Sequence, residues 1–139
     1  MPAKDLLHNS AKNSLEKDGW IVTQESFHIK LSPKVEVYID MVAEKVIAAE
    51  KMGQKIAVEV KSFLGVSAIS EFHLAVGQFL NYRLALQQVE PERILYLGIP
   101  LDAYNQFFSD SFIQSAIQEY RIRLMVFNPV REEIVLWKD

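Results

Sequence analysis

The chain contains no cysteine, which excludes disulfide bonds and thiolate metal sites. No apolar run approaches the roughly 18–20 residues that a membrane-spanning helix needs. The opening segment, MPAKDLLHNSAKNSLEKDGW, has no continuous apolar stretch of the secretory type. No repeat, linker or low-complexity tract interrupts the chain. From these absences we expect a cytoplasmic protein without a membrane segment.

Strong charge of one sign is also missing. The net charge is −3, from 15 basic and 18 acidic residues, and only five residues are arginines. Proteins that coat nucleic acid usually carry a basic excess that neutralises phosphates. Any contact of this chain with DNA must therefore be local, metal-assisted or shared with a partner.

Several sequence motifs are absent. The glycines form neither a GxxxxGK phosphate loop nor a GxGxxG fingerprint, and the three histidines lack the HExxH spacing of a zinc helix. No GxSxG sequence is present, which argues against a serine hydrolase of that type.

The composition is that of a folded domain. Half of the residues are apolar and 24% are charged, the balance of a globular protein rather than of a disordered tail. A length of 139 residues is enough for one core and too short for two independent ones. We therefore predict one domain over residues 1–139.

Hydrophobic periodicity predicts an α/β fold with one mixed central sheet flanked by helices. The predicted core has the order α-β-β-β-α-β, followed by a helical stretch and two strands. The segment 43–50 is predicted to be a helical or irregular excursion. The predicted helices cover 3–18, 67–88 and 101–119, the last broken near Ser109-Asp110, and the predicted extended segments cover 20–31, 35–40, 56–61, 93–99, 122–127 and 133–137.

Three polar side chains on two of these strands suggest a catalytic site. Glu59 and Lys61 are two apart on one strand, so both project to the same face. Asp40 ends the preceding strand on its polar face, and we expect the two strands to pair. Paired carboxylates hold Mg²⁺ or Mn²⁺, hard cations that prefer oxygen ligands, and the lysine can orient water or stabilise a transition state. This arrangement suits hydrolysis of a phosphodiester.

An ordinary explanation of the same residues stays open. Glu and Lys two apart on a strand commonly form a solvated pair, and an Asp at a strand end commonly starts a turn. An acidic-x-Lys triplet is also expected about once by chance in a chain of this length and composition.

The long helix adds two candidates. Gln78 and Tyr82 are four apart and share a face, and Gly77 would let the helix approach the sheet closely. The amide and the phenol could contact a metal-bound water or a phosphate. Alternatively, Tyr82 packs in the core and Gln78 caps a neighbouring strand. On the first helix, His8 and Lys12 are weaker candidates for phosphate contacts, because a solvated helix face is the commoner explanation of their spacing.

Asp40 with Glu59-Val60-Lys61, set in this order of elements, resembles the PD-(D/E)xK nuclease superfamily, although Ile39 replaces the motif's proline. The sequence QFLNY at 78–82 is similar to the QxxxY motif of its RecB-like branch. The chain also resembles, nearly end to end, the XisH family of fdxN element excision controlling factors. The segments PAKDLLHNSAKNSLEKDGW, GQKIAVEVKSFLG, PERILYLGIP and RIRLMVFNP carry this second resemblance.

The resemblance implies a restriction-endonuclease-like fold and a role in programmed DNA excision during heterocyst differentiation in cyanobacteria. It implies that Asp40 and Glu59 are metal ligands and Lys61 the catalytic lysine, supported by Gln78 and Tyr82. The implied partners are DNA, a companion protein of the XisI type and a separate site-specific recombinase.

Two classes of function stay open. The first is a metal-dependent DNA endonuclease or nicking enzyme that uses Asp40, Glu59 and Lys61. The second is a non-catalytic accessory factor of an excision complex that acts through protein or DNA contacts. A homo-oligomer is a further hypothesis, since the apolar strands that end near Trp137 could form an interface unless the helices of 101–119 cover them.

Overall fold

The computed structural model describes residues 3–39, 41–45, 53–63 and 65–139. Its main element is a mixed six-stranded sheet with the strand order β1-β4-β5-β6-β7-β8. The strands β5, β6 and β7 are parallel to one another, and every other neighbouring pair is antiparallel. The strands of this sheet are β1 (Trp20–Gln24), β4 (Met41–Lys45), β5 (Gln54–Val60), β6 (Arg93–Pro100), β7 (Leu124–Asn128) and β8 (Glu133–Lys138).

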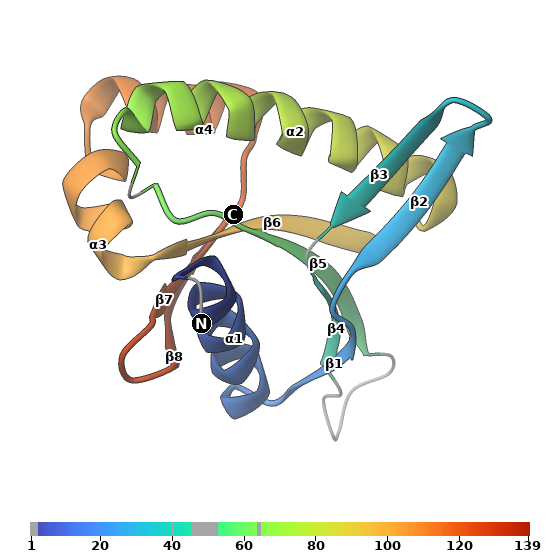
Figure 1. Cartoon of the computed structure of the whole chain (residues 1–139), viewed down its shortest axis with the longest axis horizontal. Helices are drawn as coiled ribbons and strands as arrows, with labels where there is room; N and C mark the ends of the chain where they lie inside the picture. Colours follow the sequence, from blue (N-terminus) through green and yellow to red (C-terminus); the bar gives the residue numbers. More distant parts are fainter. Residues whose placement is uncertain (1–2, 40, 46–52, 64) are drawn as a thin grey trace.

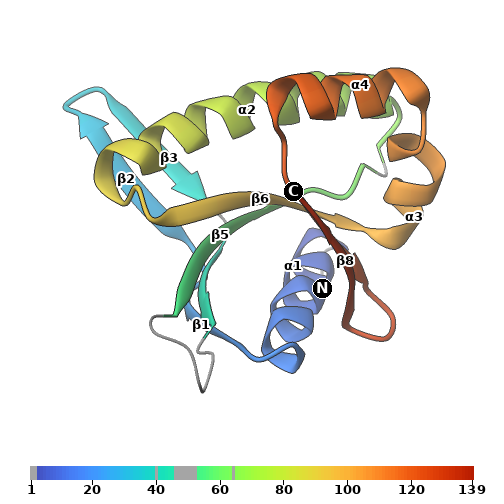
Figure 2. The same cartoon turned by 180° about the vertical axis from the view of Figure 1, so that it is seen from behind.

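Helices cover both faces of this sheet. One face packs on α1 (Ala3–Lys17), and the other packs on α2 (Ala68–Val89) and on a helical stretch after β6. That stretch consists of α3 (Leu101–Ala103), a π-helical turn η1 (Tyr104–Phe108) and α4 (Ser111–Tyr120). Figures 1 and 2 show the sheet arched over α1, with α2 and α4 on its outer side. The predicted α/β architecture with a mixed sheet between helices is confirmed.

The alternation of β5 divides its side chains between two cores. Ile56 and Val58 are buried in the α1-side cluster, which also contains Leu15, Trp20 and Phe127. Ala57 instead belongs to the α2-side cluster. That second cluster includes Phe72, Phe79, Leu97, Phe108 and Leu124. Because side chains alternate along a strand, Glu59 faces the α2 side, as Ala57 does.

A separate two-stranded hairpin, β2 (Phe27–Ser32) with β3 (Val35–Ile39), stands beside α2 (Figure 1). The sequence predicted one extended segment over 20–31, whereas the chain turns at Glu25-Ser26 and begins a new strand in another sheet. The predicted pairing of the 35–40 strand with β5 is also wrong, because β3 pairs with β2.

The second strand of the main sheet is β4, which pairs with β1 and β5. The helical or irregular segment that the sequence predicts over 43–50 is wrong for residues 43–45, which belong to β4, while 46–50 lie outside the described residues. With the hairpin set aside, the main sheet and its helices run in the order α1, β1, β4, β5, α2 and β6. The second strand of the predicted α-β-β-β-α-β order, 35–40, lies in the hairpin instead, and β4 takes its place in the main sheet.

The helix ends follow their local chemistry. Gly19, at φ +96°, ends α1 in a conformation that glycine adopts without strain. The Ser67 hydroxyl accepts a hydrogen bond from the Ser70 N–H at 3.3 Å and so caps α2, as predicted. No described helix has the length and apolar character that crossing a membrane requires.

Two glycines differ in their surroundings. A Cβ on Gly98 would lie 2.8 Å from Val58 Cγ1, so this position requires glycine for strand packing. At Gly77 a Cβ would meet nothing within 4 Å and the residue is exposed. The expectation that Gly77 brings α2 close to the sheet is therefore wrong.

Candidate nuclease-like site

Glu59 is a buried carboxylate near the end of β5, with an exposed fraction of 7%. Acidic side chains are seldom buried without a charged or hydrogen-bonding partner. Here the Lys61 ammonium lies 3.5 Å from Glu59 Oε1. The lysine side chain is 28% exposed, so it reaches from solvent toward the carboxylate. The structure therefore brings together these two predicted site residues on one side of the sheet.

Two contacts fix the backbone around Lys61: its own hydrogen bond to β6 and the packing of Phe63. The Lys61 N–H donates to the Gly98 carbonyl at 2.9 Å, which extends the β5–β6 pairing by one residue beyond the strand. Two residues later, Phe63 is buried at φ +56°, a conformation that costs a bulky side chain about 1–2 kcal/mol. The Phe63 ring packs edge-on against Phe108, with centroids 4.9 Å apart, and stacks on Phe107. This packing fixes the loop that carries Lys61.

Gln78 lies on the stripe of α2 that faces the sheet, between the buried residues Ala75 and Phe79. Its amide oxygen Oε1 is buried and accepts no hydrogen bond from any residue that the structure describes. A buried acceptor without a donor is rare in folded proteins, so Gln78 Oε1 is a position where a polar ligand would be favourable. Gln78 Oε1 therefore accepts no strand N–H from the described residues, which argues against the strand-capping alternative for this atom.

Tyr82 follows one turn later on the same stripe and packs, partly buried, against the α2-side cluster. The core-packing interpretation of Tyr82 is therefore correct for its ring. Its role beside the site remains a prediction.

Asp40, the second predicted metal ligand, lies outside the described residues. The strands that flank it in sequence belong to different sheets, since β3 ends at Ile39 and β4 begins at Met41. The backbone of Met41 pairs with Val58, the residue before Glu59. Within the described part of the chain, no three His, Asp or Glu residues gather as a metal-binding group. A metal site at Glu59 would need Asp40, so the predicted ligand pair stays a prediction.

His8 and Lys12 lie on α1, on the opposite side of the sheet from Glu59 (Figures 1 and 2). The Lys12 ammonium contacts the Glu25 carboxylate, and this hydrogen bond and charge raise the pKa of Lys12. The same contact lowers the pKa of Glu25. The two residues therefore do not join Glu59 and Lys61 in one site, and their phosphate contacts remain untested.

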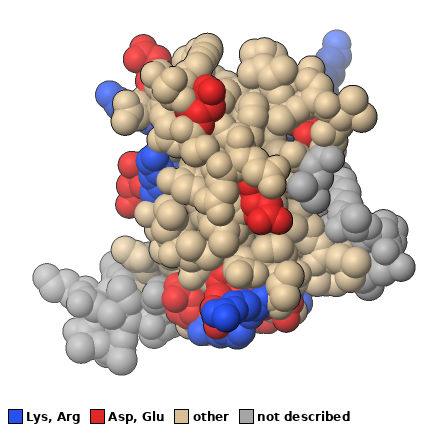
Figure 3. All heavy atoms as spheres, turned by 90° about the vertical axis from the view of Figure 1, so that its left-hand side faces the viewer, with Lys and Arg blue, Asp and Glu red and all other residues tan. Residues whose placement is uncertain are grey.

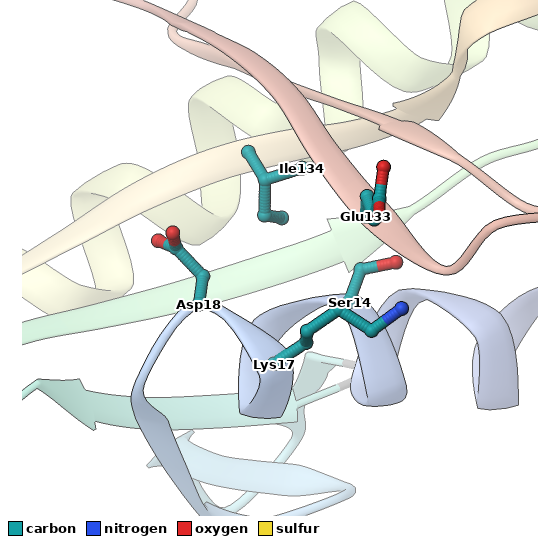
Figure 4. Close-up of a pocket in the computed structure, with 5 residues that line it drawn as sticks. All are labelled: Ser14, Lys17, Asp18, Glu133 and Ile134. Atoms are coloured by element: carbon teal, nitrogen blue, oxygen red, sulfur yellow. The ribbon is translucent and has the colours of Figure 1, made fainter.

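Two hollows lie away from Glu59, and the sequence motifs pointed to neither. A cavity of about 210 Å³ lies between the C-terminal end of α1 and β8, lined by Ser14, Lys17, Asp18, Glu133 and Ile134 (Figure 4). In the close-up, the carboxylates of Asp18 and Glu133 stand on different sides of this hollow. A structural contact holds the two sides of this hollow together, since Lys17 Nζ of α1 donates to the Arg131 carbonyl at 2.7 Å.

The second hollow, of about 260 Å³, lies under the arch of the sheet and is lined by Trp20, Tyr96 and Trp137 among others. Aromatic residues at wide sequence spacing gave no local pattern from which this contact could be predicted.

The surface charge is scattered. In Figure 3 most of the coloured surface is neither acidic nor basic, and the basic groups at the bottom lie among acidic ones. On this face, the residues drawn in colour form no extended basic surface of the kind that coats DNA.

The fold and the Glu59–Lys61 pair define an α/β protein with a mixed sheet and a charged pair at the end of a central strand. Comparison with known proteins adds the family. The family model described as XisH protein matches residues 1–135, and the chain belongs to the XisH family. No curated protein matches the chain.

Two crystal structures are similar over almost the whole chain. An XisH family protein from Nostoc punctiforme PCC 73102 is 43% identical, with a TM-score of 0.88, over 97% of this chain and 100% of that one. An fdxN element excision controlling factor protein from Anabaena variabilis is 44% identical, with a TM-score of 0.86, over 97% and 99% of the two chains.

Proposed function

We propose that this chain is a controlling factor for programmed excision of a DNA element, with a nuclease-like site at Glu59 and Lys61. Family membership and the 44% identity to the Anabaena variabilis controlling factor support the biological role. The observation that carries the site is a nearly buried carboxylate with an ammonium 3.5 Å away at the end of a central strand.

The order of elements supports a restriction-endonuclease-like fold. The main sheet and its helices run α1, β1, β4, β5, α2, β6, with the β2–β3 hairpin inserted between the first two strands. Glu59 and Lys61 lie on and just after the third strand of this series, where the PD-(D/E)xK pattern expects them. The helix that follows carries Gln78 and Tyr82 on its sheet-facing stripe.

The donor set suits a hard divalent cation such as Mg²⁺ or Mn²⁺. Glu59 and Asp40 would supply carboxylate oxygens, and Gln78 Oε1 is an acceptor without a donor among the described residues. Such a cation would supply Lewis acidity and neutralise charge on a phosphodiester. Lys61, still partly open to solvent, would orient a water or stabilise negative charge on the scissile phosphate.

The energetics favour a functional role for the pair over a stabilising one. Removing a carboxylate from water is costly, and hydrophobic side chains of similar volume often stabilise a fold as well or better. The 3.5 Å separation from Lys61 is longer than the 2.7–2.9 Å of a strong charge-assisted hydrogen bond, so this contact is a loose ion pair.

A second candidate function is a non-catalytic accessory factor that binds an XisI-type companion, DNA or both within a recombinase complex. The net charge of −3 favours this alternative, because a nuclease that acts alone needs more electrostatic attraction to DNA. In both cases strand exchange would belong to the separate recombinase.

Cleavage of supercoiled plasmid with Mg²⁺ or Mn²⁺ distinguishes the two functions. We expect the full chain, alone or with its companion protein, to nick or cut the plasmid, and Glu59→Gln and Lys61→Met to lose at least a hundredfold in rate. Glu119→Gln, on the exposed face of α4, is the matched control and should keep full activity.

Excision measured in cells completes the test. If no metal or companion elicits cleavage and both variants still restore excision, the catalytic site is excluded and the accessory role remains. If excision also persists when the whole chain is deleted, the controlling role is excluded as well.

A further inference from the structure

Three of the five arginines gather where α4 ends beside α2 and β7 begins. The Arg83 guanidinium of α2 donates from one Nη to the carbonyls of Tyr120, at 3.0 Å, and Arg121, at 2.8 Å. Arg123 follows immediately before β7, and its carbonyl accepts from the Leu97 N–H. We call Arg83, Arg121 and Arg123 the arginine cluster.

The positive charges of this cluster repel one another. Burial, followed by the charges of Arg123 and Arg121, lowers the pKa of Arg83, which agrees with the close approach seen in the hydrogen bonds. Among the described residues, the cluster's ion pair is that of Arg123 Nε with Asp139 Oδ1, at 3.8 Å. The Asp139 side chain is 70% exposed and its Oδ1 also accepts from the Tyr96 hydroxyl at 2.7 Å, so the long contact with Arg123 is a screened one. The carbonyls at the end of α4 attract these positive charges, and the side-chain ion pair of the cluster with an acid is the long one to Asp139, so three guanidinium groups share few acidic partners among the described residues.

Arg121 also occupies a strained position. It caps α4 at φ +54°, and the Ile122 N–H donates to the Ile117 carbonyl in the bonding pattern of a Schellman turn. Glycine or asparagine is usual at this place, because a longer L-residue costs roughly 1–2 kcal/mol there. An exposed arginine at a site that suits glycine points to an external partner for its charge.

The cluster lies apart from the Glu59 site. Glu59, Leu97 and Leu124 are in register on β5, β6 and β7, so the backbone of Arg123 is two strands away, roughly 10 Å. The arginine cluster is therefore spatially separate from the Glu59–Lys61 pair.

We propose that the arginine cluster binds the phosphodiester backbone of duplex DNA, an inference that rests on the proposed role in DNA excision. Planar guanidinium groups bind phosphate oxygens through paired, charge-assisted hydrogen bonds. A chain with a net charge of −3 needs local contacts of this kind to hold DNA. Arg83 anchors the turn, while Arg121, which is exposed, and Arg123, whose side chain is 39% exposed, contact the phosphates.

Fluorescence anisotropy of the full-length chain with a labelled 30-base-pair duplex, measured over a series of salt concentrations, tests this assignment. The double variant Arg121→Asn, Arg123→Gln should raise the Kd about tenfold at 100 mM salt. The slope of log K against log salt should fall by about two, one for each lost phosphate contact. Arg121→Asn keeps or raises the thermal midpoint, since asparagine accepts positive φ.

Two controls make the result decisive. The charge-preserving variant Arg121→Lys, Arg123→Lys should retain most of the salt slope, and Arg131→Gln, on the turn between β7 and β8, should bind as the wild type does. An unchanged Kd and slope in the double variant, an equal loss in Arg131→Gln, or no binding of duplex by the wild type overturns the proposal. The readout is independent of cleavage, so an inactive Glu59 site leaves this result standing.

Discussion

At the scale of single residues, the candidate site depends on the placement of Glu59 next to Lys61. Strand alternation fixes the face on which Glu59 and Lys61 project, and the structure confirms their proximity at 3.5 Å. This part of the site could be predicted from sequence because a period of two depends only on the strand. The φ of +56° at Phe63 could not, since it follows from packing against rings more than forty residues away.

A functional carboxylate usually destabilises the fold that carries it. We therefore expect Glu59→Gln to raise the free energy of unfolding of the metal-free chain by about 1 kcal/mol, because a neutral amide is cheaper to bury than a carboxylate whose ion pair with Lys61 is a loose one. Urea denaturation followed by circular dichroism measures this change, with Glu119→Gln as the control. A loss of several kcal/mol would instead show that Glu59 holds the fold together.

Ionisation of Tyr96 lowers the free energy of unfolding at high pH. Its phenol donates to Asp139 Oδ1 at 2.7 Å, and burial, then this hydrogen bond, raises the pKa of Tyr96 above its ordinary value of 10.0. The folded chain thus holds the proton more tightly than the unfolded chain, so this contribution is full below pH 10 and is lost as the pH rises above it.

When the pH rises from 9 to 11, the free energy of unfolding of Tyr96→Phe should therefore fall by about 1 kcal/mol less than that of the wild type. Tyr38→Phe, which alters a side chain of a residue that is 57% exposed, serves as the control. Urea unfolding at both pH values provides the comparison, and parallel losses in all three proteins would contradict the account.

At the scale of elements, the central strands and long helices were predictable, and the division into sheets was not. The strand β4, with the sequence MVAEK, contains Ala, Glu and Lys, which favour helix as readily as strand. It is a strand because β1 and β5 on its two sides satisfy its backbone groups. The turn at Glu25-Ser26 contains neither glycine nor proline, so no turn signal separated β1 from β2.

Two glycine substitutions test the packing of β5 and α2. Gly98→Ala should cost roughly 1–3 kcal/mol, because its Cβ would lie 2.8 Å from Cγ1 of the buried Val58. Gly77→Ala should stabilise the chain by about 0.5–1 kcal/mol, because the site is open and alanine favours helix. Thermal unfolding of the two variants and the wild type shows whether each substitution stabilises or destabilises the chain. Equal effects would show that the strands β5 and β6 are not packed as described.

At the scale of the whole molecule, aromatic rings join the two edge strands of the main sheet on the side that packs on α1. Trp20 on the edge strand β1 and Trp137 on the edge strand β8 have ring centroids 5.7 Å apart. Tyr96, from the centre of the sheet, packs edge-on against Trp137 at 4.9 Å. These two ring contacts connect the edges of the arched sheet and cover part of the α1-side cluster.

Trp137→Ala should accordingly cost about 2–4 kcal/mol, since it removes a large, partly buried ring that joins two edges of one sheet. Val135→Ala, at a residue of the same strand that is 45% exposed, should cost well under 1 kcal/mol. Denaturant unfolding compares the two. A loss of similar size in both variants would mean that the tryptophan contact contributes little.

The central claim, that Glu59 binds a divalent cation, is tested most directly by calorimetric titration of the full chain with Mn²⁺. We predict one bound ion per chain in the wild type and in Glu119→Gln, and at least a tenfold weaker affinity in Glu59→Gln, because an amide replaces the charged oxygen ligand. Binding of Mn²⁺ to Glu59→Gln with the affinity of the wild type, or no binding to any of the three, would contradict the account.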